Sequence, residues 1–186
     1  ILGDNLFFGP NLNNIVKDGI NNNSGATIFC IESDNPERFG VIEFDKKFKA
    51  ISINEKPKNP KTKWVVTGLY IYNNQAPKYA KSLKKSYRGE YEITDLNNLY
   101  LKQEKLEVLL LDAGTAWLDA GTPDSLLEAA HFVQTIQHRQ LIQIGCIEEI
   151  ALNQGFISKE KFKKIAREAP INKYGNYLRD LEKNLS

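Results

Sequence analysis

Residues 1–31 have the sequence ILGDNLFFGPNLNNIVKDGINNNSGATIFCI, and this stretch decides the fold class. Ile1–Leu2 indicates a short apolar strand that stops at Gly3-Asp4-Asn5. Apolar side chains then recur at helical spacing from Leu12 to Ile20, after Pro10, and residues 26–31 have the apolar character of a buried strand. The order strand, helix, strand favours a parallel α/β sheet.

Downstream, the pattern predicts more strands and helices of the same layered fold. Two short apolar segments flank a polar turn at 45–47, which is typical of a β-hairpin. Residues 64–72 (WVVTGLYIY) are rich in β-branched and aromatic residues and form the strongest strand pattern. We therefore expect an α/β fold with a mixed, mostly parallel sheet and flanking helices. The remaining predicted elements are strands over 40–44, 49–53 and 106–111 and helices over 77–87 and 93–102.

From Thr122 onward the sequence becomes mostly helical. Thr122 is a good N-cap, Pro123 suits the first helical position, and Asp124 favours the positive end of the helix dipole. Further helices are expected after Ser158 and around Tyr174. The predicted organisation is an α/β portion over residues 1–121 and a helical assembly region over residues 122–186.

Composition excludes several classes of protein. The 186 residues carry 25 Lys and Arg against 23 Asp and Glu, and the charges are mixed along the chain. The sequence therefore shows no basic footprint for nucleic acid. No apolar run approaches the roughly 20 residues of a membrane span, so we expect no membrane partner. Two cysteines, Cys30 and Cys146, cannot build a disulfide framework, and reduced thiols in the cytoplasm are the simpler interpretation.

Asp4 and Asp119 are the candidate metal ligands. Asp4 follows the apolar Ile1–Leu2, and the crevice beyond the carboxyl ends of strands is the usual ligand site of α/β sheets. Asp119 lies in a Trp-Leu-Asp-Ala-Gly sequence directly before a capped helix. Mg²⁺ takes one or two carboxylates and leaves its other positions to phosphate or water, so the two aspartates could share one ion. Capping of the following turn or helix is the alternative role for each.

Glu55-Lys56 and Arg88 are candidate substrate-binding groups. A carboxylate accepts hydrogen bonds from two sugar hydroxyls, and an adjacent ammonium neutralises a phosphate. Arg meets phosphate with a two-pronged guanidinium. The alternatives are a solvated surface pair for Glu55-Lys56 and a charged helix end for Arg88. His131 and His138 share a helix without a third ligand, which indicates no metal site.

Taken in order, six motifs resemble the glucose-1-phosphate thymidylyltransferases, a family of sugar nucleotidyltransferases. The resemblance implies a sheet of the nucleotide-diphospho-sugar transferase type, which is Rossmann-like. It also implies transfer of a nucleotidyl group from dTTP to α-D-glucose 1-phosphate, giving dTDP-glucose and pyrophosphate, as the first step of dTDP-L-rhamnose synthesis. The motifs are LGDN (2–5), PERFGVIEFD (36–45), EKP (55–57), VTGLYIY (66–72), RGEYEITDLN (88–97) and WLDAGT (117–122).

The family's functional positions can be carried over one by one. Asp4 and Asp119 match the paired Mg²⁺ ligands, and Lys56 and Arg88 match cationic, catalytic positions near the sugar phosphate. Phe39 stands where many relatives have Tyr, and Ala120 where many have Thr. The positions that match the sugar pocket and its walls are Phe39, Gly40, Glu55, Val66, Tyr70 and Trp117.

The resemblance also implies features that these 186 residues do not show. The family begins with a GGxGTR loop and a KxLLP lysine, so we expect about a third of the enzyme to precede Ile1 and this piece alone to be a poor catalyst. Relatives are homotetramers with a regulatory nucleotide site. An arginine common before the Trp-Leu-Asp motif is not evident at residues 112–115. The alternatives are a uridylyl or other sugar-1-phosphate nucleotidyltransferase and a non-catalytic sugar-phosphate-binding or assembly fragment.

Overall fold

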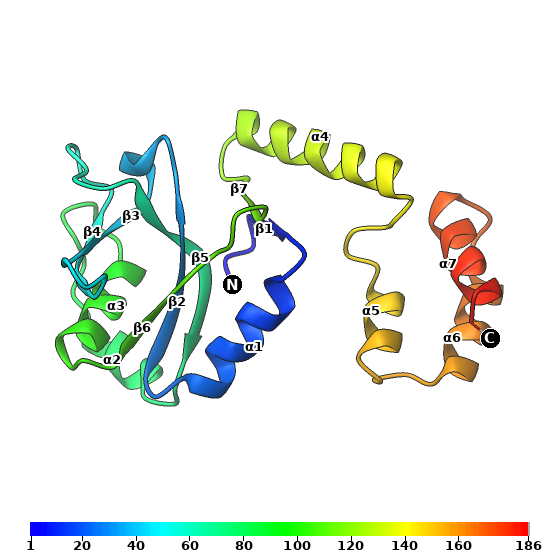
Figure 1. Ribbon diagram of the computed structural model, residues 1–186, viewed down its shortest axis with the longest axis horizontal. Helices are drawn as coiled ribbons and strands as arrows, with labels where there is room; N and C mark the ends of the chain where they lie inside the picture. Colours follow the sequence, from blue (N-terminus) through cyan, green and yellow to red (C-terminus); the bar gives the residue numbers. More distant parts are fainter. Residues whose placement is uncertain (186) are drawn as a thin grey trace. The chain divides into compact units, whose positions relative to one another are not determined.

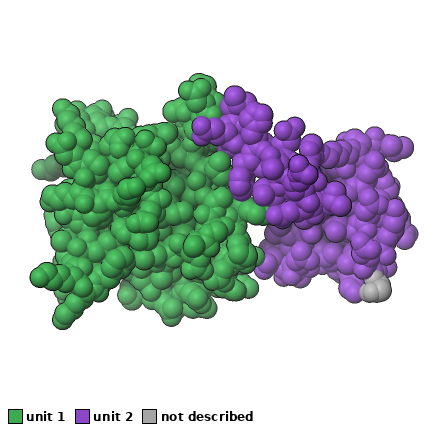
Figure 2. Space-filling view, turned by 45° about the horizontal axis from the view of Figure 1, so that its top comes forward, with its two compact units in different colours: residues 1–125 green, residues 126–186 purple. Residues whose placement is uncertain are grey.

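The computed structural model describes residues 1–185, which form two compact units. The first comprises Ile1–Ser125 and the second begins at Leu126 (Figure 2). The boundary expected from the sequence, between residues 121 and 122, falls four residues earlier, at the last turn before the helix α4 (Pro123–Gln140).

The strands of the first unit form two sheets. A two-stranded sheet pairs β1 (Asn5–Phe8) with β7 (Ala116–Asp119). The larger sheet has the strand order β4-β3-β5-β2-β6. Its strands are β2 (Ala26–Glu32), β3 (Gly40–Phe44), β4 (Ala50–Glu55), β5 (Trp64–Tyr72) and β6 (Leu106–Leu110).

The mixed α/β class is confirmed, but two details of the prediction are wrong. Among the strands of residues 1–185, only β2 and β6 pair in parallel, whereas the other pairings are antiparallel. The cause is the hairpin β3–β4, after which β5 returns antiparallel to both β2 and β3. The first strand is β1 rather than Ile1–Leu2, because the chain turns at Gly3-Asp4 before it pairs with β7. Asp4 therefore precedes a strand instead of following one.

Helices cover both faces of the larger sheet (Figure 1). The helix α1 (Leu12–Asn22) lies on one face, where Gly19 allows close contact because a Cβ there would lie 3.0 Å from the ring of Phe29. The helices α2 (Ala76–Ser82) and α3 (Ile93–Lys102) lie on the other face. The helix α2 ends five residues before the predicted Tyr87, and the Ser82 hydroxyl donates to the Tyr79 carbonyl at this end.

Side chains along β2 alternate between the two faces of the larger sheet, so this strand contributes to the core on both faces. Phe29 faces α1, whereas Ile28 and Cys30 belong to the cluster on the opposite face with Ile42 and Ile53. All five side chains are at most 3% exposed. A strand that is buried on both faces is expected to be nearly continuously apolar, and β2 is apolar except for Thr27 and its last residue, Glu32. Burial also raises the pKa of the Cys30 thiol, which keeps it protonated.

Over residues 126–185, the regular secondary structure of the second unit is helical. The Ser158 and Asn172 side chains cap α6 (Lys159–Glu168) and α7 (Lys173–Lys183) by accepting from backbone N–H groups, as expected for Ser and Asn at this position. Its core contains Cys146, Phe162, Ala166 and Leu178. Among the helices of residues 1–185, none is both long and apolar enough to cross a membrane. The helices are α4, α5 (Ile147–Asn153), α6 (Lys159–Glu168) and α7 (Lys173–Lys183).

We predict that Ile28→Ala lowers the free energy of unfolding by about 2–5 kcal/mol, because it removes methylene groups from a fully buried position and leaves a cavity. Ile51→Ala in β4 is the matched control. Since Ile51 is 56% exposed, this change should cost about 0.5 kcal/mol or less. Urea unfolding followed by circular dichroism measures both, and equal costs would contradict the placement of β2 in the core.

Candidate functional site

Nearly all the side chains selected from the sequence line one cavity of the first unit. The cavity has a volume of about 200 Å³ and lies among β1, β3, β4, β5, β7 and the start of α3. Arg88 does not line it but lies against one of its lining carboxylates, that of Glu55. The predicted residues that line the cavity are Asp4, Phe39, Gly40, Glu55, Lys56, Val66, Tyr70, Trp117 and Asp119.

The β1–β7 pairing brings the two candidate metal ligands together. In the antiparallel register Asn5 lies opposite Asp119, so Asp4, one residue before Asn5, lies beside the end of β7. The Ala120 N–H donates to the Asp4 carbonyl over 2.8 Å and continues this pairing beyond the strands. A Cβ added to Gly121 would lie 3.2 Å from Oδ2 of Asp4 and 3.3 Å from Oδ1 of Asp119. Both carboxylates thus face one gap that glycine leaves open.

This gap fits a divalent cation held by two carboxylates. Among residues 1–185 no group of three or more His, Cys, Asp and Glu side chains is arranged to hold a metal ion. Mg²⁺ requires no such group, because it commonly keeps one or two carboxylates and completes its octahedron with phosphate and water. The guanidinium of Arg38 lies 3.5 Å from Oδ2 of Asp119 and supplies a positive charge at the same place.

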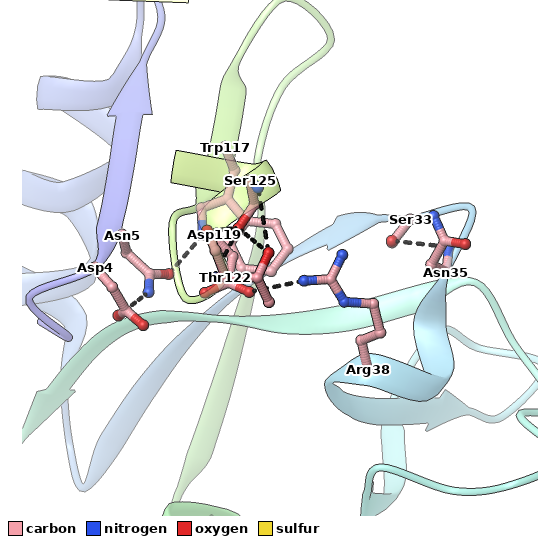
Figure 3. A network of polar contacts seen from close by, with 9 residues as sticks. All are labelled: Asp4, Asn5, Ser33, Asn35, Arg38, Trp117, Asp119, Thr122 and Ser125. Carbon is pink, nitrogen blue, oxygen red and sulfur yellow. Dashed lines mark hydrogen bonds and ion pairs between the residues drawn. The ribbon is translucent and has the colours of Figure 1, made fainter. Parts of the chain in front are cut away.

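An asparagine connects this pair to the aromatic wall of the cavity. Oδ1 of Asn5 accepts from the indole N–H of Trp117 over 2.6 Å and from the backbone N–H of Gly68 over 3.0 Å. Its Nδ2 donates to Oδ1 of Asp4 over 2.9 Å. Figure 3 shows Asp4, Asn5 and Trp117 in this chain of contacts, with Arg38 reaching Asp119 from the other side.

A hydroxyl group and a guanidinium group hold the Glu55 carboxylate in place. The buried Thr94 hydroxyl donates to Oε2 of Glu55. The Arg88 guanidinium lies 3.7 Å from Oε1 of Glu55 and also contacts Glu90 and Glu92 at 3.0 and 3.5 Å. Arg88 therefore lies against three carboxylates in this structure, and Glu55 presents an oriented acceptor to the cavity.

The remaining lining residues define the shape of the cavity. The rings of Phe39 and Trp117 are in contact, with centroids 4.9 Å apart. Burial, reinforced by the negative charge of Glu55, raises the pKa of Tyr70, so its neutral phenol can donate a hydrogen bond at physiological pH. Lys56 has a positive φ of 42°, an uncommon conformation for a residue with a side chain, and its N–H donates to the Phe39 carbonyl. The strained residue turns the chain at the end of β4.

Several residues that line the cavity were not selected from the sequence. Among them, Asn5, Arg38 and Thr94 make polar side-chain contacts with predicted site residues. Asn5 and Arg38 lie inside the quoted motifs LGDN and PERFGVIEFD, and Thr94 lies inside RGEYEITDLN. A motif shows which segments converge, but the partner of each polar side chain depends on contacts between segments that are distant in the sequence.

Comparison with known proteins identifies the family of this chain. Residues 1–136 match the model of the nucleotidyl transferase family. A glucose-1-phosphate thymidylyltransferase of Neisseria meningitidis is 51% identical over 96% of this chain and 62% of its own length. One of Mycolicibacterium smegmatis is 48% identical over 97% of this chain and 62% of its own length. The chain therefore spans about three fifths of the curated relatives it matches.

Solved structures show the same fold. A proposed glucose-1-phosphate thymidylyltransferase of Bacillus anthracis, crystallised with sucrose, matches with a TM-score of 0.62 and 43% identity over 71% of this chain and 52% of its own. A UDP-glucose pyrophosphorylase bound to UDP-glucose gives the same TM-score at 19% identity over 73% of this chain and 55% of its own, a likeness of fold alone. Because the family model matches residues 1–136, which are most of this chain, the chain belongs to the nucleotidyl transferase family.

Proposed function

We propose that the whole protein is a glucose-1-phosphate thymidylyltransferase. It transfers a nucleotidyl group from dTTP to α-D-glucose 1-phosphate and produces dTDP-glucose and pyrophosphate, the first step of dTDP-L-rhamnose synthesis. One observation carries this proposal: a single cavity combines the paired carboxylates Asp4 and Asp119 with the Glu55-Lys56 pair. The names of the Neisseria and Mycolicibacterium relatives support the choice of substrates. A cytoplasmic location remains a prediction.

The sugar half of the substrate would lie against β3, β4 and β5. Glu55, oriented by Thr94 and Arg88, accepts hydrogen bonds from hexose hydroxyls. Gly40 allows the backbone to approach the hexose ring. A Cβ at this position would lie 3.1 Å from Oγ1 of Thr94. Tyr70 and Trp117 supply the cavity walls.

The phosphate half requires positive charge at a cavity that carries three carboxylates. Lys56 lines the cavity and is exposed, so its ammonium can reach the sugar phosphate, and Arg88 can turn from Glu55 toward the same group. Asp4 and Asp119 would hold Mg²⁺ in the gap beside Gly121. The bound ion would offset the negative charge that accumulates as the sugar phosphate attacks the α-phosphorus of dTTP.

The first prediction from this proposal concerns Asp119. In the whole protein with Mg²⁺, dTTP and glucose 1-phosphate, pyrophosphate release should fall at least about 100-fold in Asp119→Asn, because the isosteric amide does not supply the anionic ligand. Asp34→Asn is the control, since Asp34 is exposed and forms an ion pair with Lys63. Near-normal turnover in Asp119→Asn would contradict the metal assignment, and a preference for UTP over dTTP would contradict the nucleotide.

A second prediction separates the roles of Glu55 and Lys56. Glu55→Gln should reduce discrimination between glucose, galactose and glucosamine 1-phosphates, because a carboxylate that accepts sugar hydroxyls rejects analogues with a misplaced group. Lys56→Ala should instead raise KM and lower kcat for all three sugar phosphates alike. Steady-state kinetics with each substrate measures both effects. The same pattern for both variants would show that the two residues do not divide the substrate between them.

We also propose that the helical second unit is an assembly element and that the protein is a homotetramer. Its surface carries many large apolar side chains that are at least half exposed, and exposed apolar patches mark interfaces. The sequence of this unit contains few candidate catalytic residues. The exposed apolar side chains are Leu126, Leu127, Leu141, Ile147, Ile150, Phe156 and Ile171.

The corresponding prediction is measured by sedimentation velocity of the whole protein at micromolar concentration. The sedimenting mass should be that of four chains, and a double change of Leu126→Glu and Leu127→Glu should shift it to smaller species by placing charge in an apolar contact. Phe48→Glu is the control, because Phe48 is 55% exposed on the first unit. A fully active monomer would refute the assembly role.

A further inference from the structure

The side chain of Asn5 joins three parts of the cavity. None of the roles proposed above uses this residue. Its Oδ1 accepts two hydrogen bonds, from Trp117 and from Gly68, while its Nδ2 donates to Asp4. These contacts connect the wall of the cavity, the central strand β5 and a candidate metal ligand (Figure 3). With two donors on one atom and an acceptor on the other, the amide has one orientation.

No other short side chain provides this combination. An aspartate keeps the acceptor for Trp117 and Gly68 but would set a second carboxylate against Oδ1 of Asp4, where like charges repel. An alanine supplies neither group. The fit also depends on Gly68, because a Cβ at that position would lie 2.5 Å from Oδ1 of Asn5. Glycine in β5 therefore leaves the space that the amide fills.

The amide determines which oxygen of Asp4 faces Asp119. Oδ1 of Asp4 receives the hydrogen bond from Asn5, and Oδ2 is the oxygen near the gap beside Gly121. Asp4 is exposed, so without such a partner its carboxylate would sample several rotamers. Hydrogen bonds of this kind orient metal ligands and commonly determine metal affinity.

We propose that Asn5 is a positioning residue that aligns the Asp4 carboxylate for the divalent cation and, with the same amide, fixes the Trp117 ring against the substrate. The role rests on the proposed function, since it requires that Asp4 and Asp119 hold the ion. Asn5 acts through these two side chains and contacts no reacting atom. Because one amide makes both contacts, the cation site and the aromatic wall are mechanically linked: displacing the amide disturbs both.

Two measurements on the whole protein test this role without relying on turnover. Electron paramagnetic resonance measures the dissociation constant of Mn²⁺ alone, and ¹⁵N–¹H correlation spectra report the indole N–H of Trp117, assigned with Trp117→Phe. In Asn5→Ala we expect Mn²⁺ to bind about 10-fold or more weakly. The Trp117 indole proton resonance should move upfield in the same variant, because it loses a 2.6 Å hydrogen bond.

Asn11→Ala is the matched control. Asn11 is an exposed asparagine whose Nδ2 donates to the Asp112 carboxylate over 2.8 Å, away from the cavity. This variant loses the same kind of bond and should change neither readout. If Asn5→Ala does not fold, Gly68→Ala replaces it. The Cβ added at position 68 displaces the Asn5 amide and leaves its chemical groups unchanged. Gly68→Ala should therefore weaken Mn²⁺ binding and shift the Trp117 resonance.

The outcomes separate this role from the proposed function. Unchanged Mn²⁺ binding in Asn5→Ala, with binding lost in Asp119→Asn, would overturn the role of Asn5 and leave the metal site intact. Wild-type Mn²⁺ binding in Asp119→Asn would overturn the metal site itself and, with it, the role of Asn5. An unmoved Trp117 resonance in a folded Asn5→Ala protein would overturn the link between the ring and the carboxylate.

Discussion

The antiparallel pairing of β1 with β7 is the constraint on which the candidate site depends. Asn5 and Trp117 lie 112 positions apart in the sequence, yet their side chains are hydrogen-bonded because the register sets Asn5 opposite Asp119 and Phe7 opposite Trp117. The short ribbon thus carries both aspartates and one aromatic wall. A slip of β1 by one residue would turn its side chains to the face opposite those of Trp117 and Asp119, so the site depends on this register.

The larger sheet contributes the other half of the cavity by the same kind of antiparallel pairing. Gly40 lies opposite both Glu55 on β4 and Val66 on β5, so three predicted sugar-site residues lie side by side across three strands. The buried Thr94 at the start of α3 fixes the carboxylate among them. Helices and sheet together create a rigid support, which functional side chains require if they are to keep a set geometry.

Charge is nearly balanced within the site. Asp119 has the guanidinium of Arg38 as a neighbour and Glu55 has that of Arg88, whereas the Asp4 carboxylate accepts from the neutral amide of Asn5. Such pairs are partly exposed and contribute little to stability, but they orient the two carboxylates. The arrangement favours a polyanionic substrate accompanied by a cation, because both signs of charge are already available at the cavity.

The sequence by itself determined the elements with strong local patterns. The strand Trp64–Tyr72 and the helix Ile93–Lys102 have the predicted ends, since β-branched residues and helical periodicity act within a few neighbouring positions. Ordered motifs likewise indicated the family and nine of the residues that line the cavity. Strand direction, the placement of Asp4 before a strand and the partners of Asn5, Arg38 and Thr94 were decided only by the tertiary structure. These features depend on pairing and contact between segments far apart in the chain, and local pattern carries no information about which distant backbone will supply the partner.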